Sequence, residues 1–196
     1  LEAGRAVILP TETVYGIFAK ALNQEAVDYI YELKRRPRDK ALNLNVADEN
    51  TIRIYSKNQP SYLTKLIHSF LPGPLTIILQ ANEKVPNWIH SGLDTVGFRI
   101  PAHPKTLDLI RKYGPLVGPS ANLSGHASGT KYRAIVSEFD QVVPGIEDDD
   151  FLTGQDSTIL DISSSKARIL RQGSITKADL LAQVPELSFE EDELPQ

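Results

Sequence analysis

Apolar residues along the 196-residue chain recur at two spacings, one typical of strands and one typical of helices. Short apolar or alternating runs predict strands at residues 5–10, 42–46, 75–79, 95–100 and 116–118, and a hairpin of residues 157–162 and 167–170. Helical spacing predicts helices at residues 25–35, 60–71, 106–113 and 131–139, and a last helix after Thr176. This order predicts an α/β fold with an open, twisted sheet of parallel and antiparallel strands, flanked by helices.

The segment 42–46 alternates apolar and polar residues with a period of two. Asn43 and Asn45 therefore share one face of a strand, while Leu42, Leu44 and Val46 face the core. One face of this strand is free for chemistry.

Length and composition fit one globular domain, since 41% of the residues are hydrophobic. We expect the domain to span residues 1–186 and the acidic residues 187–196 to form a disordered tail. Two acidic runs, residues 147–150 and 186–193, hold nine of the 25 acidic residues and none of the 21 basic ones. The rest of the chain therefore has a net charge of +5 and favours anionic ligands, although the whole chain has a net charge of −4.

Several classes of protein are disfavoured by what the sequence lacks. There is no cysteine, which predicts a reducing, cytoplasmic location, and no apolar run approaches the roughly 20 residues of a membrane span. The chain has no Gly-x-x-x-x-Gly-Lys-Ser/Thr, Gly-x-Gly-x-x-Gly, His-Glu-x-x-His or Gly-x-Ser-x-Gly motif. Its four histidines do not fall at metal-ligand spacing, so we assign no metal-binding residue and expect no membrane partner.

Four polar segments lie at the ends of predicted strands, where open α/β sheets bind ligands: residues 10–16, 34–40, 95–101 and 118–130. Residues 34–40 hold five basic side chains, more than the end of one helix would attract, which favours phosphate or carboxylate binding. Arg99 lies on a strand face and needs an anionic partner. The residues alone therefore predict a pocket for a polyanion such as a nucleotide, without a standard phosphate-binding loop.

Seven short motifs follow one another in the sequence. They are Pro-Thr-Glu-Thr-Val-Tyr-Gly at 10–16, Lys-x-Arg-Pro at 34–37, Pro-Gly-Pro-Leu-Thr at 72–76, Arg-Ile-Pro-Ala-His-Pro at 99–104, Pro-Ser-Ala-Asn-Leu-Ser-Gly at 119–125, Asp-Ser-Thr-Ile-Leu-Asp at 156–161 and Leu-Arg-Gln-Gly at 170–173. In this order and spacing they resemble the YrdC/TsaC family, the threonylcarbamoyl-AMP synthases.

The resemblance implies a YrdC-like fold around a basic concave cavity and an enzyme that makes L-threonylcarbamoyladenylate. Its substrates would be L-threonine, bicarbonate and ATP, with Mg²⁺, and pyrophosphate would be released. A tRNA-modifying transferase complex would use the product, and weak tRNA binding is a further expected interaction. Because no C-terminal extension is visible, the chain resembles the short, single-domain form of the family.

The family's motifs also imply site residues. The threonine site falls on Thr13, Tyr15, Asn45, Arg99, Ser120 and Ser157. The ATP site falls on Arg36, Lys40, Thr95, Asn122, Thr130 and Arg171, and the candidate catalytic residues are Lys34, Arg36 and Lys40. Asn45 stands where many members have histidine, so a direct acid–base role at this position is disfavoured.

Two other functions compete with this interpretation. The same basic surface could hold RNA in a non-catalytic tRNA- or ribosome-associated module, although aromatic residues do not interleave with the cations as in a stacking platform. A carbamoyl- or acyltransferase that uses a preformed adenylate is the other alternative, and it predicts no pyrophosphate release from ATP.

Overall fold

The computed structural model describes residues 1–127, 129–140 and 142–190. Its strands are β1 (Val7–Leu9), β2 (Gly16–Lys20), β3 (Leu44–Asn45), β4 (Ser56–Lys57), β5 (Leu75–Ala81), β6 (Thr95–Arg99), β7 (Leu116–Val117), β8 (Thr158–Asp161) and β9 (Arg168–Arg171). Its helices are α1 (Gln24–Lys34), α2 (Glu49–Tyr55), α3 (Leu63–Phe70), α4 (Asn87–His90), α5 (Pro104–Tyr113), α6 (Tyr132–Glu138) and α7 (Lys177–Gln183), with a 3₁₀ turn at Asp149–Phe151.

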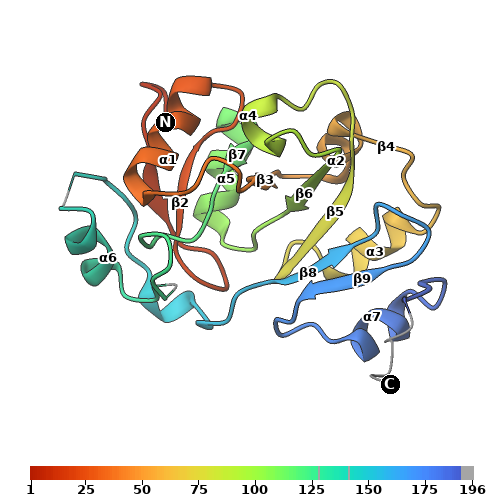
Figure 1. Cartoon of the computed structure of the whole chain (residues 1–196). Helices are drawn as coiled ribbons and strands as arrows, with labels where there is room; N and C mark the ends of the chain where they lie inside the picture. The colour runs from red at the N-terminus through yellow and green to blue at the C-terminus, as the bar shows by residue number, and fades with distance from the viewer. Residues whose placement is uncertain (128, 141, 191–196) are drawn as a thin grey trace, which may run out of the picture.

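Within these described ranges, nine strands form one mixed sheet in the order β1-β2-β7-β3-β6-β5-β8-β9, with β4 paired to β5 (Figure 1). The pairs β3–β6 and β5–β8 are parallel, and the other pairs are antiparallel. The red N-terminal strands and the blue C-terminal hairpin lie at opposite ends of the sheet. The predicted open sheet of parallel and antiparallel strands is confirmed.

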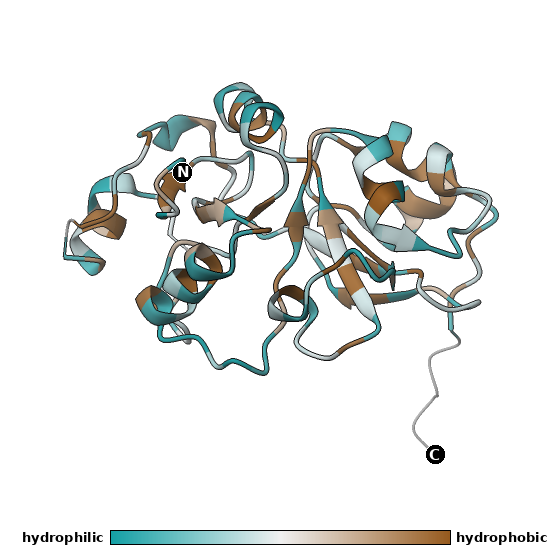
Figure 2. Cartoon of the chain, turned by 90° about the horizontal axis from the view of Figure 1, so that it is seen from above, coloured by the Kyte–Doolittle hydropathy of each residue, from teal (hydrophilic) through white to brown (hydrophobic). Residues whose placement is uncertain are grey.

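The sheet packs against helices through two apolar clusters. Side chains alternate across β2, so Ile17 and Ala19 join the large core, whereas Phe18 packs with Leu9, Leu116 and Ile110 on the other side. Figure 2 shows helices that carry both brown apolar and teal polar residues, as expected for elements with one buried side. The middle of β2 is therefore covered on both faces.

The structure contains five elements that the sequence pattern did not predict: β2, β4, α2, α4 and the 3₁₀ turn at Asp149–Phe151. β2 is a continuous apolar run, as expected for a strand buried on both faces, and it shows no alternation. The sequence does carry a start signal for α2, because Asp48 is a residue type favoured at the N-cap of a helix. In the structure the Asp48 side chain accepts a hydrogen bond from the backbone N–H of Thr51 at 2.8 Å. No helix in the described ranges is both long and apolar enough to cross a bilayer.

The first residues of the segment expected to be a disordered tail pack against the rest of the protein. Leu187 is buried, and residues 188–190 run beside Ala167: its N–H donates to the Ser188 carbonyl at 2.8 Å, and the Glu190 N–H donates to the Ala167 carbonyl at 3.1 Å. The prediction is therefore wrong for residues 187–190, because an apolar side chain and backbone pairing hold them to the core. Residues 191–196 lie outside the described part of the chain.

Candidate functional site

A polar cavity of about 320 Å³ opens where β3, β6 and β7 meet the start of β8. Seven of the predicted site residues line it: Tyr15, Arg36, Asn45, Arg99, Ser120, Ser157 and Arg171. Each of the seven comes from a different segment of the chain. The parallel pairing of β3 with β6 places Asn45 opposite Arg99, and the parallel pairing of β5 with β8 brings the start of β8 to the same wall.

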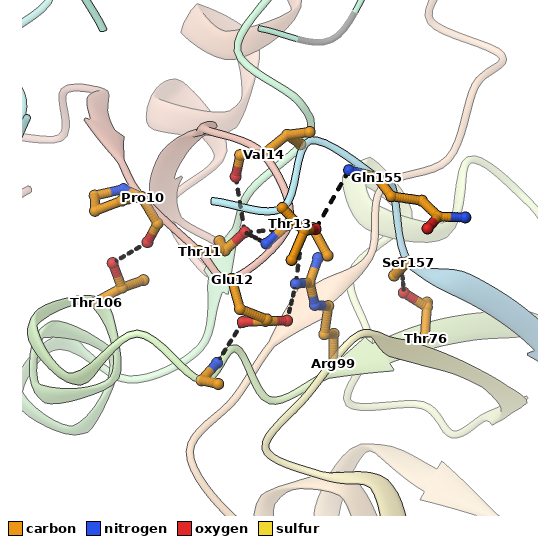
Figure 3. Close-up of polar contacts among 12 residues, drawn as sticks. Pro10, Thr11, Glu12, Thr13, Val14, Thr76, Arg99, Thr106, Gln155 and Ser157 are labelled. Carbon is orange, nitrogen blue, oxygen red and sulfur yellow. Dashed lines mark hydrogen bonds and ion pairs between the residues drawn. The ribbon is translucent and has the colours of Figure 1, made fainter. Parts of the chain in front are cut away.

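Arg99 ends β6 and is held from one side. Its Nη2 donates to the Glu12 carboxylate and to the Thr13 hydroxyl, the latter at 2.9 Å (Figure 3). Its Nε is buried and has no hydrogen-bond partner among the described residues. Buried donors are almost always paired in native proteins, so the unpaired Nε of this cavity-lining arginine is an exception.

The loop that carries Glu12 and Thr13 is itself fixed at several points. The second Glu12 oxygen accepts the Ala102 N–H at 2.7 Å, and the Thr11 and Thr13 hydroxyls share a hydrogen bond of 2.9 Å. The N–H of Gly154 donates to the Thr13 carbonyl at 2.8 Å. Thr13, a predicted threonine ligand, is 1% exposed and lies behind Arg99, outside the residues that line the cavity.

Arg171 and Ser157 meet in another part of the cavity wall. The Arg171 Nε donates to the Ser157 carbonyl at 2.9 Å, and its Nη2 donates to the Ser157 hydroxyl at 3.1 Å. That hydroxyl shares a further hydrogen bond of 2.8 Å with Thr76 of β5. The antiparallel β8–β9 pairing and the parallel β5–β8 pairing produce this contact, so the hydroxyl and the guanidinium act as one unit.

Arg36 reaches the cavity because α1 stops abruptly. Arg35 takes a left-handed conformation (φ 51°), which turns the chain, and Arg36 then donates to the Ala41 carbonyl at 2.7 Å. Lys40 is exposed and does not line the cavity, although its carbonyl accepts the Tyr31 hydroxyl at 2.6 Å. Arg36 and Lys40 belong to the same basic segment, 34–40, but only Arg36 lines the cavity.

Lys34 does not line the cavity either. Its side chain is 2% exposed, and its ammonium donates to the backbone carbonyls of Ser120 at 2.5 Å and Asn122 at 2.8 Å. Burial, together with the nearby Arg36 cation, lowers the pKa of Lys34 to about 8, and the Glu138 carboxylate opposes this shift. Lys34 therefore supports the loop behind the cavity wall, and the expectation that it reaches the ligand directly is not met by this geometry.

Asn122 also acts within its loop. Its Nδ2 donates to the carbonyls of Leu123 at 2.8 Å and His126 at 2.9 Å, and Glu138 accepts the Leu123 N–H at 2.9 Å. The Asn122 Oδ1 is buried without a partner in the described part of the chain. Ser128, in the same predicted polar segment, lies outside the described residues.

The Tyr15 side chain is occupied by protein partners. Its hydroxyl donates to the Asp149 carboxylate at 2.7 Å and accepts the Asp148 N–H at 2.7 Å, and burial above all raises its pKa. Asp148 also contacts His103 at 2.7 Å. The acidic run 147–150 thus holds its segment against Tyr15 and Tyr132. The hydrogen atom of the Tyr15 hydroxyl and one of its acceptor positions are already in use.

Two other predicted ATP residues, Thr95 and Thr130, are not among the residues lining the described cavity. Thr95 begins β6 opposite Gln80, whereas Arg99 ends the same strand. Four residues of strand separate their Cα atoms by about 13 Å. The sequence motif groups Thr95 with Arg99 because both lie on one strand face, but only the carboxyl end of that strand meets the cavity.

Asn43, Thr76 and Asp156 line the cavity and were not assigned to it. Asn43 could have been found, because the period-two pattern places it on the same strand face as Asn45. The Asn43 side chain needs a glycine at position 97 to keep its position, because a Cβ on Gly97 would lie only 2.2 Å from the Asn43 Oδ1. Thr76 ends the motif at 72–76, but its contact with Ser157 follows from the β5–β8 pairing and could not be read from the motif.

The described residues do not form a protein cage for a metal ion. Among them, no group of three or more His, Asp or Glu side chains could hold a metal. Mg²⁺ in nucleotide sites commonly takes most of its ligands from phosphates and water. The donor set here fits a metal ion that is carried by the nucleotide and does not fit an independent metal site.

The fold and the cavity define an α/β protein with a polar cavity, lined by three arginines, at the ends of strands of a mixed sheet. A family model for Sua5, YciO and YrdC proteins, described as "Telomere recombination", matches residues 1–173. The chain belongs to this family.

Two threonylcarbamoyl-AMP synthases are similar to the chain. The one from Pyrococcus abyssi is 38% identical over 177 residues, which is 89% of this chain and 52% of the relative. The one from Bacillus subtilis is 39% identical over 185 residues, 93% of this chain and 54% of the relative. The chain thus spans about half the length of these curated relatives.

The crystal structure of P. abyssi Sua5 complexed with L-threonine is also similar. It matches with a TM-score of 0.88 and 36% identity, over 96% of this chain and 56% of that one. The expected family and its YrdC-like fold are confirmed.

Proposed function

We propose that the chain carries the synthase activity of its relatives: it converts L-threonine, bicarbonate and ATP into L-threonylcarbamoyladenylate and pyrophosphate. The reaction is a nucleotidyl transfer. The observation that carries the proposal is Arg99, whose buried Nε donor has no partner among the described residues and belongs to the cavity wall. The threonine complex of the similar P. abyssi protein supports the same assignment.

Threonine would bind at the β3–β6 end of the cavity. The Arg99 guanidinium would pair with its carboxylate, since a planar guanidinium matches a carboxylate in geometry and charge. Asn45 is 5% exposed and lies beside Arg99, so its carboxamide is placed to hydrogen-bond the substrate without changing charge near neutral pH. Ser120 and Ser157 would orient the remainder of the amino acid.

ATP would bind toward Arg36 and Arg171. Both guanidinium groups donate to neutral oxygen atoms of the protein, so their positive charge stays available to a triphosphate. Lys40 is exposed near this side and would add charge at the rim. Mg²⁺ would enter on the ATP phosphates and offset part of their negative charge.

The chemistry needs positioning more than acid–base groups. The threonine amine and bicarbonate combine to a carbamate and water, and a carbamate oxygen then attacks the α-phosphorus of ATP. The bond from the α-phosphorus to the bridging oxygen breaks, and pyrophosphate leaves with that electron pair. Cations that neutralise the phosphates and fix the two substrates in line lower the barrier of such a step. The three arginines of the cavity are suited to this task.

The product determines what must follow. Threonylcarbamoyladenylate is a mixed anhydride that water can destroy, so a further transferase must consume it. We propose that this transferase complex modifies tRNA, as the resemblance implies, and that the reaction takes place in the cytoplasm. Weak direct binding of tRNA would fit the positive charge of the chain outside its acidic runs.

The test is pyrophosphate release from ATP by the purified protein, with threonine and bicarbonate each present or omitted. We expect release only when both are present. Steeply salt-dependent RNA binding without ATP turnover would contradict the proposal and favour a non-catalytic RNA-binding module. Adenylate consumption without pyrophosphate release from ATP would favour an acyltransferase.

A further inference from the structure

Glu12 is the anionic partner of Arg99. Both side chains are largely buried, with 15% and 13% of their surface exposed. One Glu12 oxygen accepts from the Arg99 Nη2, and the other accepts the backbone N–H of Ala102 at 2.7 Å (Figure 3). The carboxylate thus joins the guanidinium to the backbone just beyond β6, and neither oxygen is left without a donor.

This arrangement fixes the guanidinium of a cavity-lining arginine through one of its nitrogens. Glu12 and Thr13 take both N–H bonds of Nη2, whereas Nε has no partner among the described residues. The Glu12 backbone is also held, because its carbonyl accepts the Thr153 N–H at 3.0 Å. A guanidinium fixed at one nitrogen loses little rotational freedom when its other nitrogens bind an anion.

Glu12 also changes the charge at this end of the cavity. The pair formed by Glu12 and Arg99 is formally neutral, whereas Arg36 and Arg171 are bonded to neutral oxygens. A phosphate placed against Arg99 would meet the Glu12 carboxylate with two negative charges, and a carboxylate ligand would meet it with one. Specificity often rests on repulsion of the wrong ligand as well as on attraction of the right one.

We propose that Glu12 is a positioning and specificity-determining residue that presents Arg99 to the threonine carboxylate and keeps phosphate groups away from that end of the cavity. The proposal rests on the proposed synthase function. It assigns no proton transfer and no substrate contact to Glu12, which acts through Arg99.

The experiment compares the wild-type protein with Glu12→Gln, and Asp108→Asn serves as the matched control. Asp108 forms an exposed ion pair with Arg111 at 3.0 Å, so the control also replaces an arginine-paired carboxylate by an amide. Glu12→Gln should raise the KM for threonine about tenfold and change the KM for ATP less than about twofold. Inorganic phosphate should compete with threonine at least about fivefold more strongly in Glu12→Gln than in the wild type.

A double-variant cycle with Arg99→Ala tests whether Glu12 acts through the guanidinium. In the Arg99→Ala background, Glu12→Gln should leave the KM for threonine unchanged. An additional increase there, or an unchanged phosphate inhibition constant in the single variant, would overturn the proposal.

Thermal melting of each variant checks that it is folded. If Glu12→Gln does not fold, Glu12→Asp replaces it: the shorter carboxylate should raise the KM for threonine while phosphate inhibition stays at the wild-type level. Phosphate inhibition that strengthens in Glu12→Asp as well would overturn the charge argument.

A wild-type protein that neither binds threonine in calorimetry nor releases pyrophosphate would overturn the proposed function and this inference together. Normal wild-type activity with an unaffected Glu12→Gln variant would overturn the inference alone.

Discussion

The Lys34 ammonium donates to the backbone carbonyl of Asn122 at 2.8 Å, and this contact joins the end of α1 to the loop after β7. The two residues are 88 positions apart in the sequence. A second bond from the same ammonium reaches the Ser120 carbonyl, so one buried side chain determines the course of the loop that lines the cavity.

Lys34→Met should destabilise the protein. The substitution keeps much of the apolar volume but leaves two buried carbonyls without their donor, which costs about 3 kcal/mol in the free energy of unfolding. Urea denaturation at pH 7 measures this change. Lys57→Met, an exposed position on β4, is the control and should change the free energy of unfolding by less than about 0.5 kcal/mol. Equal effects of the two substitutions would contradict the structural role of Lys34.

The stability contributed by Lys34 should depend on pH in a definite direction. Burial lowers its pKa in the folded protein to about 8, whereas the unfolded chain keeps the ordinary value of 10.5. Between these values the unfolded state binds one proton more, so the free energy of unfolding rises with pH. The difference between the wild type and Lys34→Met should therefore grow from pH 8 to pH 10.5, as followed by urea denaturation at several pH values. A difference that is flat or shrinks across this window would contradict the lowered pKa.

Arg99→Ala should separate the two substrates. Its guanidinium is proposed to pair with the threonine carboxylate, so its loss should raise the KM for threonine about tenfold or more and the KM for ATP much less. Steady-state pyrophosphate release at varied threonine and at varied ATP measures both constants. A larger effect on ATP than on threonine would refute the assignment of Arg99.

Arg171→Ala should give the opposite pattern, with the KM for ATP raised about tenfold, because Arg171 lines the cavity and is proposed to bind the triphosphate. Arg168, on the same strand, is paired with Asp161 at 3.3 Å and is absent from the described cavity wall. Arg168→Ala is therefore the control and should leave both constants within about twofold of the wild type. If Arg168→Ala raises the KM for ATP as much as Arg171→Ala does, a general loss of positive charge explains the effect and the assignment fails.

Tyr15→Phe should affect stability more than substrate binding. The hydroxyl binds Asp149 and the Asp148 backbone, so its removal should lower the free energy of unfolding by about 1–2 kcal/mol. The KM for threonine should change less than about twofold, as measured by pyrophosphate release. Tyr29→Phe is the matched control for loss of a phenol oxygen and should leave stability nearly unchanged. A large rise in the KM for threonine would instead show that the hydroxyl contacts the substrate.

Much of this protein follows from local sequence. Period-two alternation placed Asn43 and Asn45 on one strand face, and the helix at 24–34 and the hairpin of β8 and β9 follow from apolar spacing and turn residues. The need of Arg99 for an anionic partner was also apparent, because a charge among apolar neighbours on a strand cannot remain unpaired. These features depend on residues close together in the chain, where side-chain chemistry and backbone geometry are sufficient.

Tertiary structure decided which of the polar residues meet. The sequence could not show that Glu12 pairs with Arg99, that Lys34 lies under a loop 86 residues away, or that Thr95 sits at the far end of its strand. Strand order and register set these distances. The entropic cost of closing the long loops between such residues is offset only by the packing of the whole sheet. Types of side chain and their local faces were therefore determined by the sequence itself, whereas their grouping into one cavity was determined by the pairing of β3 with β6 and of β5 with β8.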